Sequence, residues 1–225
     1  LQHATVRALM AVRIQTLLQG HSGIRMEVIE SLLQMVNRGV YPLVPSQGSL
    51  GASGDLAPLA HVALVAIGEG EAWYQGQTMS GRQAINQAGI PIVELMAKEG
   101  LALTNGTALI STLGALAIYK AERLACVADL SAALSIEALA GTLLAFDERL
   151  HNARPHPGQI ESAAHIRKLL AGSHMVRSFD PQDIQDAYSL RCTPQVNGAA
   201  RDVIAFARRA VEIELISSND NPPIF

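Results

Sequence analysis

The stretch "LALTNGTALISTLGALAIY", residues 101 to 119, belongs to the longest run without a charged residue and decides the fold class. Its length could just span a bilayer, yet it carries polar side chains that would face lipid poorly: Thr104, Asn105, Thr107, Ser111 and Thr112. We therefore predict a helix buried on all sides within protein, and no membrane span. The helical pattern continues beyond this stretch and predicts one long helical region from about residue 107 to about 146.

The composition also favours helices. The chain has 225 residues, of which 49% are hydrophobic and 16% charged, so a substantial core can form. Aromatic residues make up only 4%, whereas a β-sandwich would call for more of them. The net charge of −3, without a basic run, argues against a nucleic-acid partner. Cys126 and Cys192 lack CxxC spacing and no signal peptide is visible, so we expect a cytoplasmic protein.

Helical spacing of apolar residues predicts further helices along the chain. They are expected at 1–19, ended by Gly20; after an N-cap at Ser22, ended by Gly39; from about Ala57; after a short hairpin and a cap at Ser80; and at 157–171 and 195–217. We predict a single all-α domain over residues 1–225, with functional residues in the connections between long helices. The first helix starts in mid-pattern, which predicts a fragment of a longer protein.

One connection is unusually long and rich in small residues. "YPLVPSQGSLGASGD", residues 41 to 55, is a fifteen-residue loop, and loops of this length are usually functional. A serine-hydrolase elbow, G-x-S-x-G, is excluded because the second glycine, Gly54, comes one position too early and no strand precedes it. The glycine patterns of phosphate-binding loops are absent. A flexible linker between helices remains the simplest alternative.

A different chemistry suits these residues better. In a tight turn, the amide nitrogen of Gly54 can approach the carbonyl carbon of Ala52 and close a five-membered ring, since glycine has the required backbone freedom. Loss of water from the ring and from the Ser53 side chain would leave an exocyclic methylidene, which is a strong electrophile. Ordinary side chains are nucleophiles, acids or bases, so an electrophile has to come from a metal, a cofactor or the backbone itself.

Five motifs resemble those of one known family. "GSLGASGDLAPLAH" at residues 48–61 is similar to the signature of the aromatic amino acid ammonia-lyases and related aminomutases. Four more motifs follow in the family's order: "LALTNGTA" at 101–108, "RPHPGQ" at 154–159, "IQDAYSLRCTPQVNGAARD" at 184–202 and "NDNPPIF" at 219–225. The resemblance covers essentially the whole chain. It implies a helical bundle of the ammonia-lyase/fumarase-like type and places this chain in the central portion of a longer enzyme.

The resemblance also implies a prosthetic group made from the chain. Ala52, Ser53 and Gly54 would cyclise autocatalytically to 4-methylideneimidazol-5-one, and Asp55 would help the turn or the cyclisation. Asn105 would hydrogen-bond this group or the substrate amine. From the residues alone, Asn105 could instead cap the helix that begins near Thr107.

A second set of residues is implied to bind the substrate. Gln185 and Tyr188 would line the site, Arg191 would pair with the substrate carboxylate, and Phe225 would pack near the electrophile. A planar guanidinium suits a bidentate contact with a carboxylate. The alternatives are a surface ion pair for Arg191 and ordinary loop anchors for Gln185 and Tyr188. The family usually has "QDPYSLRC" and "NPL", whereas this chain has Ala187 in place of the first proline and "NPPIF" at its end.

The function that the resemblance implies is elimination of ammonia from L-histidine to give urocanate, in a homotetramer whose sites combine residues of neighbouring subunits. A phenylalanine or tyrosine lyase, an aminomutase, or an inactive helical oligomerisation fragment are the alternatives. The family's general-base tyrosine is expected upstream of residue 1, and a glutamate of histidine-specific members downstream of residue 225. No metal is expected, because Glu161 and His165 on one helix face, with His151 and His156 nearby, do not define a site.

Overall fold

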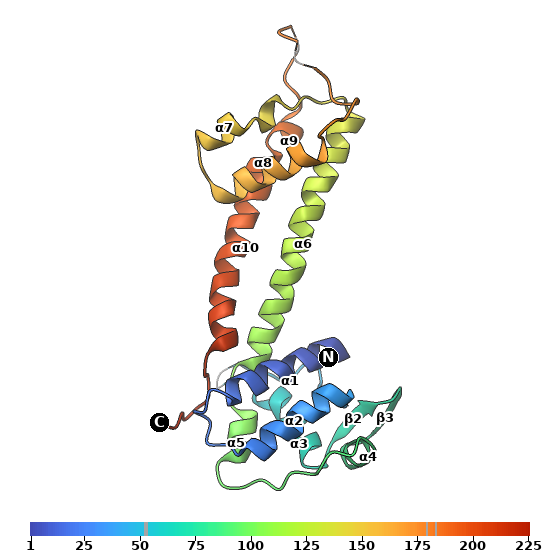
Figure 1. Cartoon of the computed structure of the whole chain (residues 1–225), viewed down its shortest axis with the longest axis vertical. Coiled ribbons are helices and arrows are strands. Elements are labelled where there is room, and N and C mark those ends of the chain that lie inside the picture. Colours follow the sequence, from blue (N-terminus) through green and yellow to red (C-terminus); the bar gives the residue numbers. More distant parts are fainter. Residues whose placement is uncertain (52–53, 179, 183) are drawn as a thin grey trace. The chain divides into compact units, whose positions relative to one another are not determined.

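The computed structural model of the chain is mostly helical and describes residues 1–51, 54–178, 180–182 and 184–225. Ala52 and Ser53 of the predicted triplet lie outside the described residues. Figure 1 labels the elements in chain order. The contacts divide the chain into two compact units, residues 1–116 with 210–225, and residues 117–209.

The first unit begins with two helices in contact, α1 (His3–Leu17) and α2 (Met26–Arg38). As expected, Gly39 ends α2 in the left-handed conformation, at φ 74°. The predicted N-cap at Ser22 is wrong: α2 starts after Arg25, and Ser22 is buried away from the helix end. The Arg25 N–H donates 3.0 Å to the Glu99 carboxylate, so a residue distant in sequence takes the place of a local cap.

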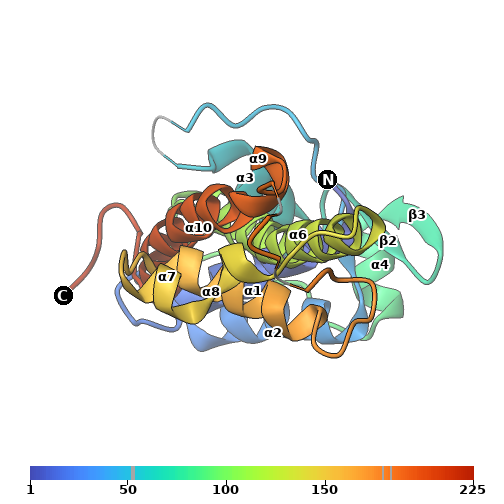
Figure 2. The same ribbon diagram turned by 90° about the horizontal axis from the view of Figure 1, so that it is seen from above.

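A loop, a helix and a small sheet follow. Figure 2 shows the loop that leads to α3 (Leu56–Ala66), which starts where the sequence predicts. Strands β1 (Tyr41–Pro42), β2 (Glu71–Tyr74) and β3 (Gln77–Ser80) form an antiparallel sheet in the order β1-β2-β3, in which Tyr41 pairs with Trp73. The expected hairpin is β2–β3, and the strand β1 is an addition to the all-α prediction. Ser80 begins α4 (Gly81–Gln87) with a capping box, which confirms the predicted cap.

The opening stretch of the sequence forms two helices rather than one. α5 (Glu99–Thr104) ends at Asn105, and α6 (Ala108–Ala138) begins after Gly106 and Thr107. The break follows from Gly106, whose φ of 146° no helix can contain. The prediction of burial on all sides is also wrong, because Ile110 is 52% exposed and Leu113 is 45% exposed.

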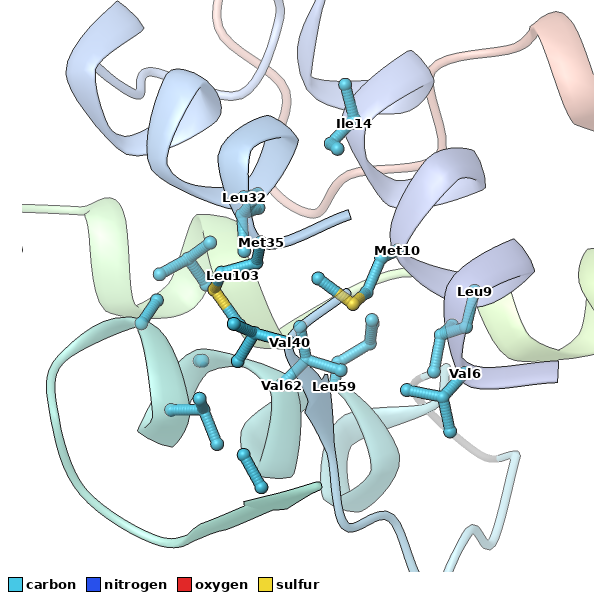
Figure 3. Close-up of a cluster of buried hydrophobic side chains, with 14 of the residues drawn as sticks. Val6, Leu9, Met10, Ile14, Leu32, Met35, Val40, Leu59, Val62 and Leu103 are labelled. Carbon is cyan, nitrogen blue, oxygen red and sulfur yellow. The ribbon is translucent and has the colours of Figure 1, made fainter. Parts of the chain in front are cut away.

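The core of the first unit includes side chains of α1, α2, α3 and α5. Figure 3 shows apolar side chains of α1, α2, α3 and α5 meeting in one cluster; those labelled include Leu9, Met10, Leu32, Met35, Leu59 and Leu103. All six are essentially inaccessible to solvent. Burial of a side chain of this size stabilises a fold by roughly 1.5–3 kcal/mol, so the cluster holds α1 and α5 firmly beside the end of the loop.

The second unit contains the later part of α6 and, among the described residues, five further elements, the last of them only as far as Arg209. They are η1 (Leu144–Phe146) with α7 (Glu148–Asn152), α8 (Pro157–Leu169), α9 (Tyr188–Arg191) and α10 (Thr193–Ile216), of which α8 and α10 confirm the predicted helices. The helical region predicted to reach 146 stops at Ala138, and Ala140 stands in a left-handed conformation just beyond it. None of the helices in the described part of the chain has an apolar stretch of the length that a bilayer requires.

Candidate active site

The end of the predicted triplet is fixed against the connection between α5 and α6. Gly54 and Gly106 form a parallel β-bridge, and the N–H of Asp55 donates 2.7 Å to the carbonyl oxygen of Gly106. Gly54 has a φ of 92°, and a Cβ at this position would overlap the Gly106 carbonyl. Only glycine meets both demands, a left-handed backbone and this close approach.

The Asp55 carboxylate attaches the same turn to α6. It is buried, at 1% exposure, and accepts hydrogen bonds from the N–H groups of Leu109 at 2.7 Å and Ile110 at 2.9 Å. The hydroxyl of Ser49 donates to it at 3.2 Å. Asp55 therefore satisfies two of the free N–H groups at the start of a long helix, where a negative charge is also favoured by the helix dipole. These contacts support a role for Asp55 in holding the turn.

Asn105 lies between the two helices, one residue before Gly106. It is the C-cap of α5, with an extended backbone, and is partly buried. The alternative that Asn105 caps the following helix is not supported, because Asp55 accepts the N–H groups that such a cap would take. Gly54, Asp55 and Asn105 thus lie together in the first unit through the Gly54–Gly106 bridge.

Two of the predicted substrate-binding residues line one cavity of the second unit. Gln185 and Arg191 contribute to a cavity of about 370 Å³, whose apolar wall includes Leu144, Leu150 and Ile184. The guanidinium of Arg191 stacks over the Tyr188 ring, with 4.6 Å from Cζ to the ring centroid. The structure therefore brings the three polar side chains of this segment together in the second unit.

Arg191 has an unused hydrogen-bond donor within the described residues, as a binding site for a carboxylate needs. Its Nε is buried without a hydrogen-bond partner, and in the part of the chain that the structure describes no carboxylate forms an ion pair with it. A surface ion pair is therefore not its role within these residues. A buried donor without a partner costs free energy, which a bound carboxylate would recover.

Asp186 is a residue of this cavity that the sequence analysis missed. Its carboxylate accepts the N–H of Thr142 at 2.7 Å and Nη2 of Arg177 at 3.0 Å, so it holds the segment before α9 in place. Only its position inside the "IQDAYSLRC" motif could have indicated it. The remaining predicted residue, Phe225, is fully exposed with its ring centroid 5.0 Å from that of His21, and packing beside the electrophile stays a prediction.

Two of the histidines considered as metal ligands, His151 and His165, have protein partners. His151 is buried, where desolvation lowers its pKa, and its ring nitrogens contact Gln159 and the Ala145 carbonyl. His165 contacts the buried carboxylate of Asp129, which also accepts from Ser162, Asn197 and Arg201 and so joins α6, α8 and α10 within the second unit. Asp129 could not be indicated by a local pattern, since only the tertiary fold gathers its partners.

Known proteins with related sequences identify the family of this chain. Residues 1–225 match the family model "Aromatic amino acid lyase", and the chain belongs to this family, as the motifs indicated. It is 55% identical to the histidine ammonia-lyase of Chloroflexus aurantiacus, over 98% of this chain and 42% of that protein. It is 50% identical to the histidine ammonia-lyase of Caldanaerobacter subterraneus, over the whole chain and 44% of that protein. These two relatives are carbon–nitrogen lyases.

Solved structures of the family have the same fold. The structure of histidine ammonia-lyase from Trypanosoma cruzi matches the whole chain with a TM-score of 0.90 at 39% identity, covering 42% of that protein. The phenylalanine aminomutase of Pantoea agglomerans matches 98% of the chain with a TM-score of 0.91 at 40% identity, covering 46% of that protein. The chain spans less than half the length of each of these relatives.

Proposed function

We propose that this chain is the central portion of a cytoplasmic ammonia-lyase that eliminates ammonia from L-histidine to give urocanate. In this proposal both units belong to one helical domain of a longer chain that assembles as a homotetramer. The observation that carries the proposal is Gly54, which stands in a left-handed conformation against the Gly106 carbonyl, where no other residue fits. Support for histidine as the substrate comes from relatives of that name at 50% to 55% identity.

The described residues fit the prosthetic group that the family implies. Ring closure would join the Gly54 nitrogen to the Ala52 carbonyl carbon and release two water molecules. One water would take the Ala52 carbonyl oxygen, and the other would take the Ser53 hydroxyl. The fixed Gly54–Asp55 peptide supplies the rigid side of such a turn, since Asp55 is bonded through both its N–H and its carboxylate. The group, once formed, supplies an electrophile that ordinary side chains lack.

Each remaining predicted residue has a role that its chemistry allows. Arg191 binds the substrate carboxylate, using among its donors the Nε that is buried without a hydrogen-bond partner in the described chain. Gln185 lines the same cavity and orients the substrate, and Tyr188 supports the guanidinium by stacking. Asn105, one residue from Gly106, hydrogen-bonds the prosthetic group or the substrate amine. Ammonia loss needs removal of a weakly acidic β-proton, and we assign that base to a part of the enzyme outside this chain.

The first experiment is intact-mass spectrometry of the full-length protein and of this chain alone. The proposal expects the full-length protein to weigh less than its sequence by two water molecules, with the deficit located in a peptide that contains residues 52–54. An unmodified mass in the full-length protein would overturn the proposal. An unmodified mass in the short chain alone would assign to it the role of an inactive helical fragment.

The second experiment separates the possible substrates. The solved aminomutases and the phenylalanine ammonia-lyase that resemble this chain, at 36% to 41% identity, make these activities the second candidate. The full-length protein is incubated with L-histidine, L-phenylalanine and L-tyrosine in turn, and the products are separated and weighed. Urocanate from histidine alone supports the proposal, an unsaturated aryl acid indicates the other lyases, and an isomeric β-amino acid indicates a mutase.

A further inference from the structure

The buried side chain of Arg13 lies against Gly106, the glycine that forms the β-bridge with Gly54. Arg13, on α1, is 1% exposed, and its Nη2 donates to the carbonyl oxygen of Ala102 in α5. A Cβ added to Gly106 would overlap Nη1 of Arg13 and would come within 2.8 Å of Oδ1 of Asn219. Gly106 is therefore enclosed, with Gly54 bonded to it by the β-bridge and with Arg13 and Asn219 against its Cα.

The charge of this arginine is retained at some cost. Burial lowers the pKa of Arg13 to about 10, while the negative charge of Asp220 acts in the opposite direction, so the group stays protonated at neutral pH. Asp220 is itself buried, and its Oδ2 accepts a hydrogen bond from Nζ of Lys98 at 3.4 Å. Nε and Nη1 of Arg13 and both polar atoms of the Asn219 side chain are buried without a hydrogen-bond partner. Apolar residues would fill such a space with less loss of solvation.

We propose that Arg13, together with Asn219, is a positioning residue for the turn that becomes the electrophile, and that it acts through Gly106. This inference rests on the proposed function. It also gives a role to the "NDN" part of the last motif, residues 219–221, which the site described above leaves unused.

The contacts give the path by which Arg13 acts. Its guanidinium fixes the last turn of α5 through the Ala102 carbonyl and occupies the space beside the Gly106 Cα, so the Gly106 peptide cannot shift in this direction. The Gly106 carbonyl then faces the Asp55 N–H, and the position of Gly54 is set by the bridge. Ring closure needs the Gly54 nitrogen within reach of the Ala52 carbonyl carbon, and a displacement of about 1 Å can slow such a step a hundredfold.

The test follows maturation rather than activity. The full-length protein is made by cell-free synthesis as wild type, R13K, R13M and R7M, and intact mass is recorded over time as two water molecules are lost. Arg7 is exposed on the same helix and provides the matched control. We expect R13M to fold with the wild-type circular dichroism spectrum but to lose water about tenfold to a hundredfold more slowly. R13K should be intermediate, and R7M should match the wild type.

The other outcomes distinguish failure of this inference from failure of the proposed function. Loss of water by R13M at the wild-type rate would overturn the inference and leave the proposed function intact. A wild-type protein that never loses water would overturn the proposed function itself. If R13M does not fold, N219A is tested in its place, because Asn219 lies against Gly106 from the C-terminal segment of the chain. Maturation of folded N219A at the wild-type rate would then overturn the inference.

Discussion

The backbone N–H of Asp55 donates a 2.7 Å hydrogen bond to the carbonyl oxygen of Gly106, which joins the end of the loop to the break between α5 and α6. The carboxylate of the same residue accepts two N–H groups in the first turn of α6, those of Leu109 and Ile110. Main chain and side chain of one residue therefore hold the loop at two places. This double attachment makes the turn rigid on one side.

Replacement of Gly54 by alanine should block maturation. A Cβ at Gly54 would overlap the Gly106 carbonyl and would also strain the left-handed backbone, so the bridge has to open. G76A is the matched control, because Gly76 has a similar φ of 84° but open space around it. Intact mass should show no loss of water in G54A and normal loss in G76A. Complete maturation of G54A would contradict the fit of the prosthetic group to this turn.

Removal of the Asp55 carboxylate should destabilise the first unit. D55A leaves two N–H groups in the first turn of α6 without their acceptor, which should lower the free energy of unfolding by about 1–3 kcal/mol. S49A is the control, since the exposed Ser49 hydroxyl only donates to the same carboxylate, and its effect should stay below about 0.5 kcal/mol. Urea unfolding followed by circular dichroism measures both. Equal stability of D55A and S49A would disprove the capping role.

Substitution of Arg191 should weaken substrate binding with little effect on folding. A guanidinium–carboxylate contact contributes roughly 1.5–3 kcal/mol, so R191M should raise KM about tenfold to a hundredfold in the full-length enzyme. R191K should recover part of the loss, because lysine keeps the charge but not the planar fork. R82M is the control, because Arg82 is exposed on α4. An unchanged KM in R191M would remove Arg191 from the substrate site.

The contribution of Glu99 to stability should be lost in acid. Hydrogen bonds from the Arg25 side chain, at 2.8 and 2.9 Å, are the main cause that lowers the pKa of Glu99 from 4.5 to about 2. Because the folded-state pKa is the lower one, the stabilisation is fully present above pH 4.5 and is lost as the pH falls toward about 2. Thermal unfolding of E99Q should therefore show a deficit at pH 7 that shrinks over this interval.

The exposed Glu30 on α2 gives the control for this measurement. E30Q should follow the wild-type melting curve at each pH, because the side chain of Glu30 is exposed to water. A deficit in E99Q that stayed constant between pH 7 and pH 2 would show that the Arg25–Glu99 pair is not the titrating interaction.

Local sequence signals predicted the elements whose ends depend on neighbouring residues. Gly39 ended α2 and Ser80 began α4 as expected, since a left-handed glycine and a capping box act within a few residues. The motifs likewise indicated Gln185 and Arg191, which line one cavity. Gly54 was indicated by the chemistry of a tight turn, and its φ of 92° agrees with it.

Other features depend on residues far apart and could not be predicted from local patterns. The start of α2 is satisfied by Glu99 rather than by Ser22, and the start of α6 is satisfied by Asp55. The long uncharged run hid a helix break, because hydropathy does not report the φ of Gly106. Asp129 collects its four partners only when α6, α8 and α10 are in place. Such contacts need the tertiary fold.

The bridge between Gly54 and Gly106 also sets an order of events during synthesis. Asp55 and Leu109 are 54 residues apart in sequence, so the loop reaches its final form only after α5 and the start of α6 have been made and have docked. The proposed ring closure then acts as a covalent checkpoint on folding. Each matured molecule would carry, as two missing waters, a permanent record that this long-range contact was once correctly formed.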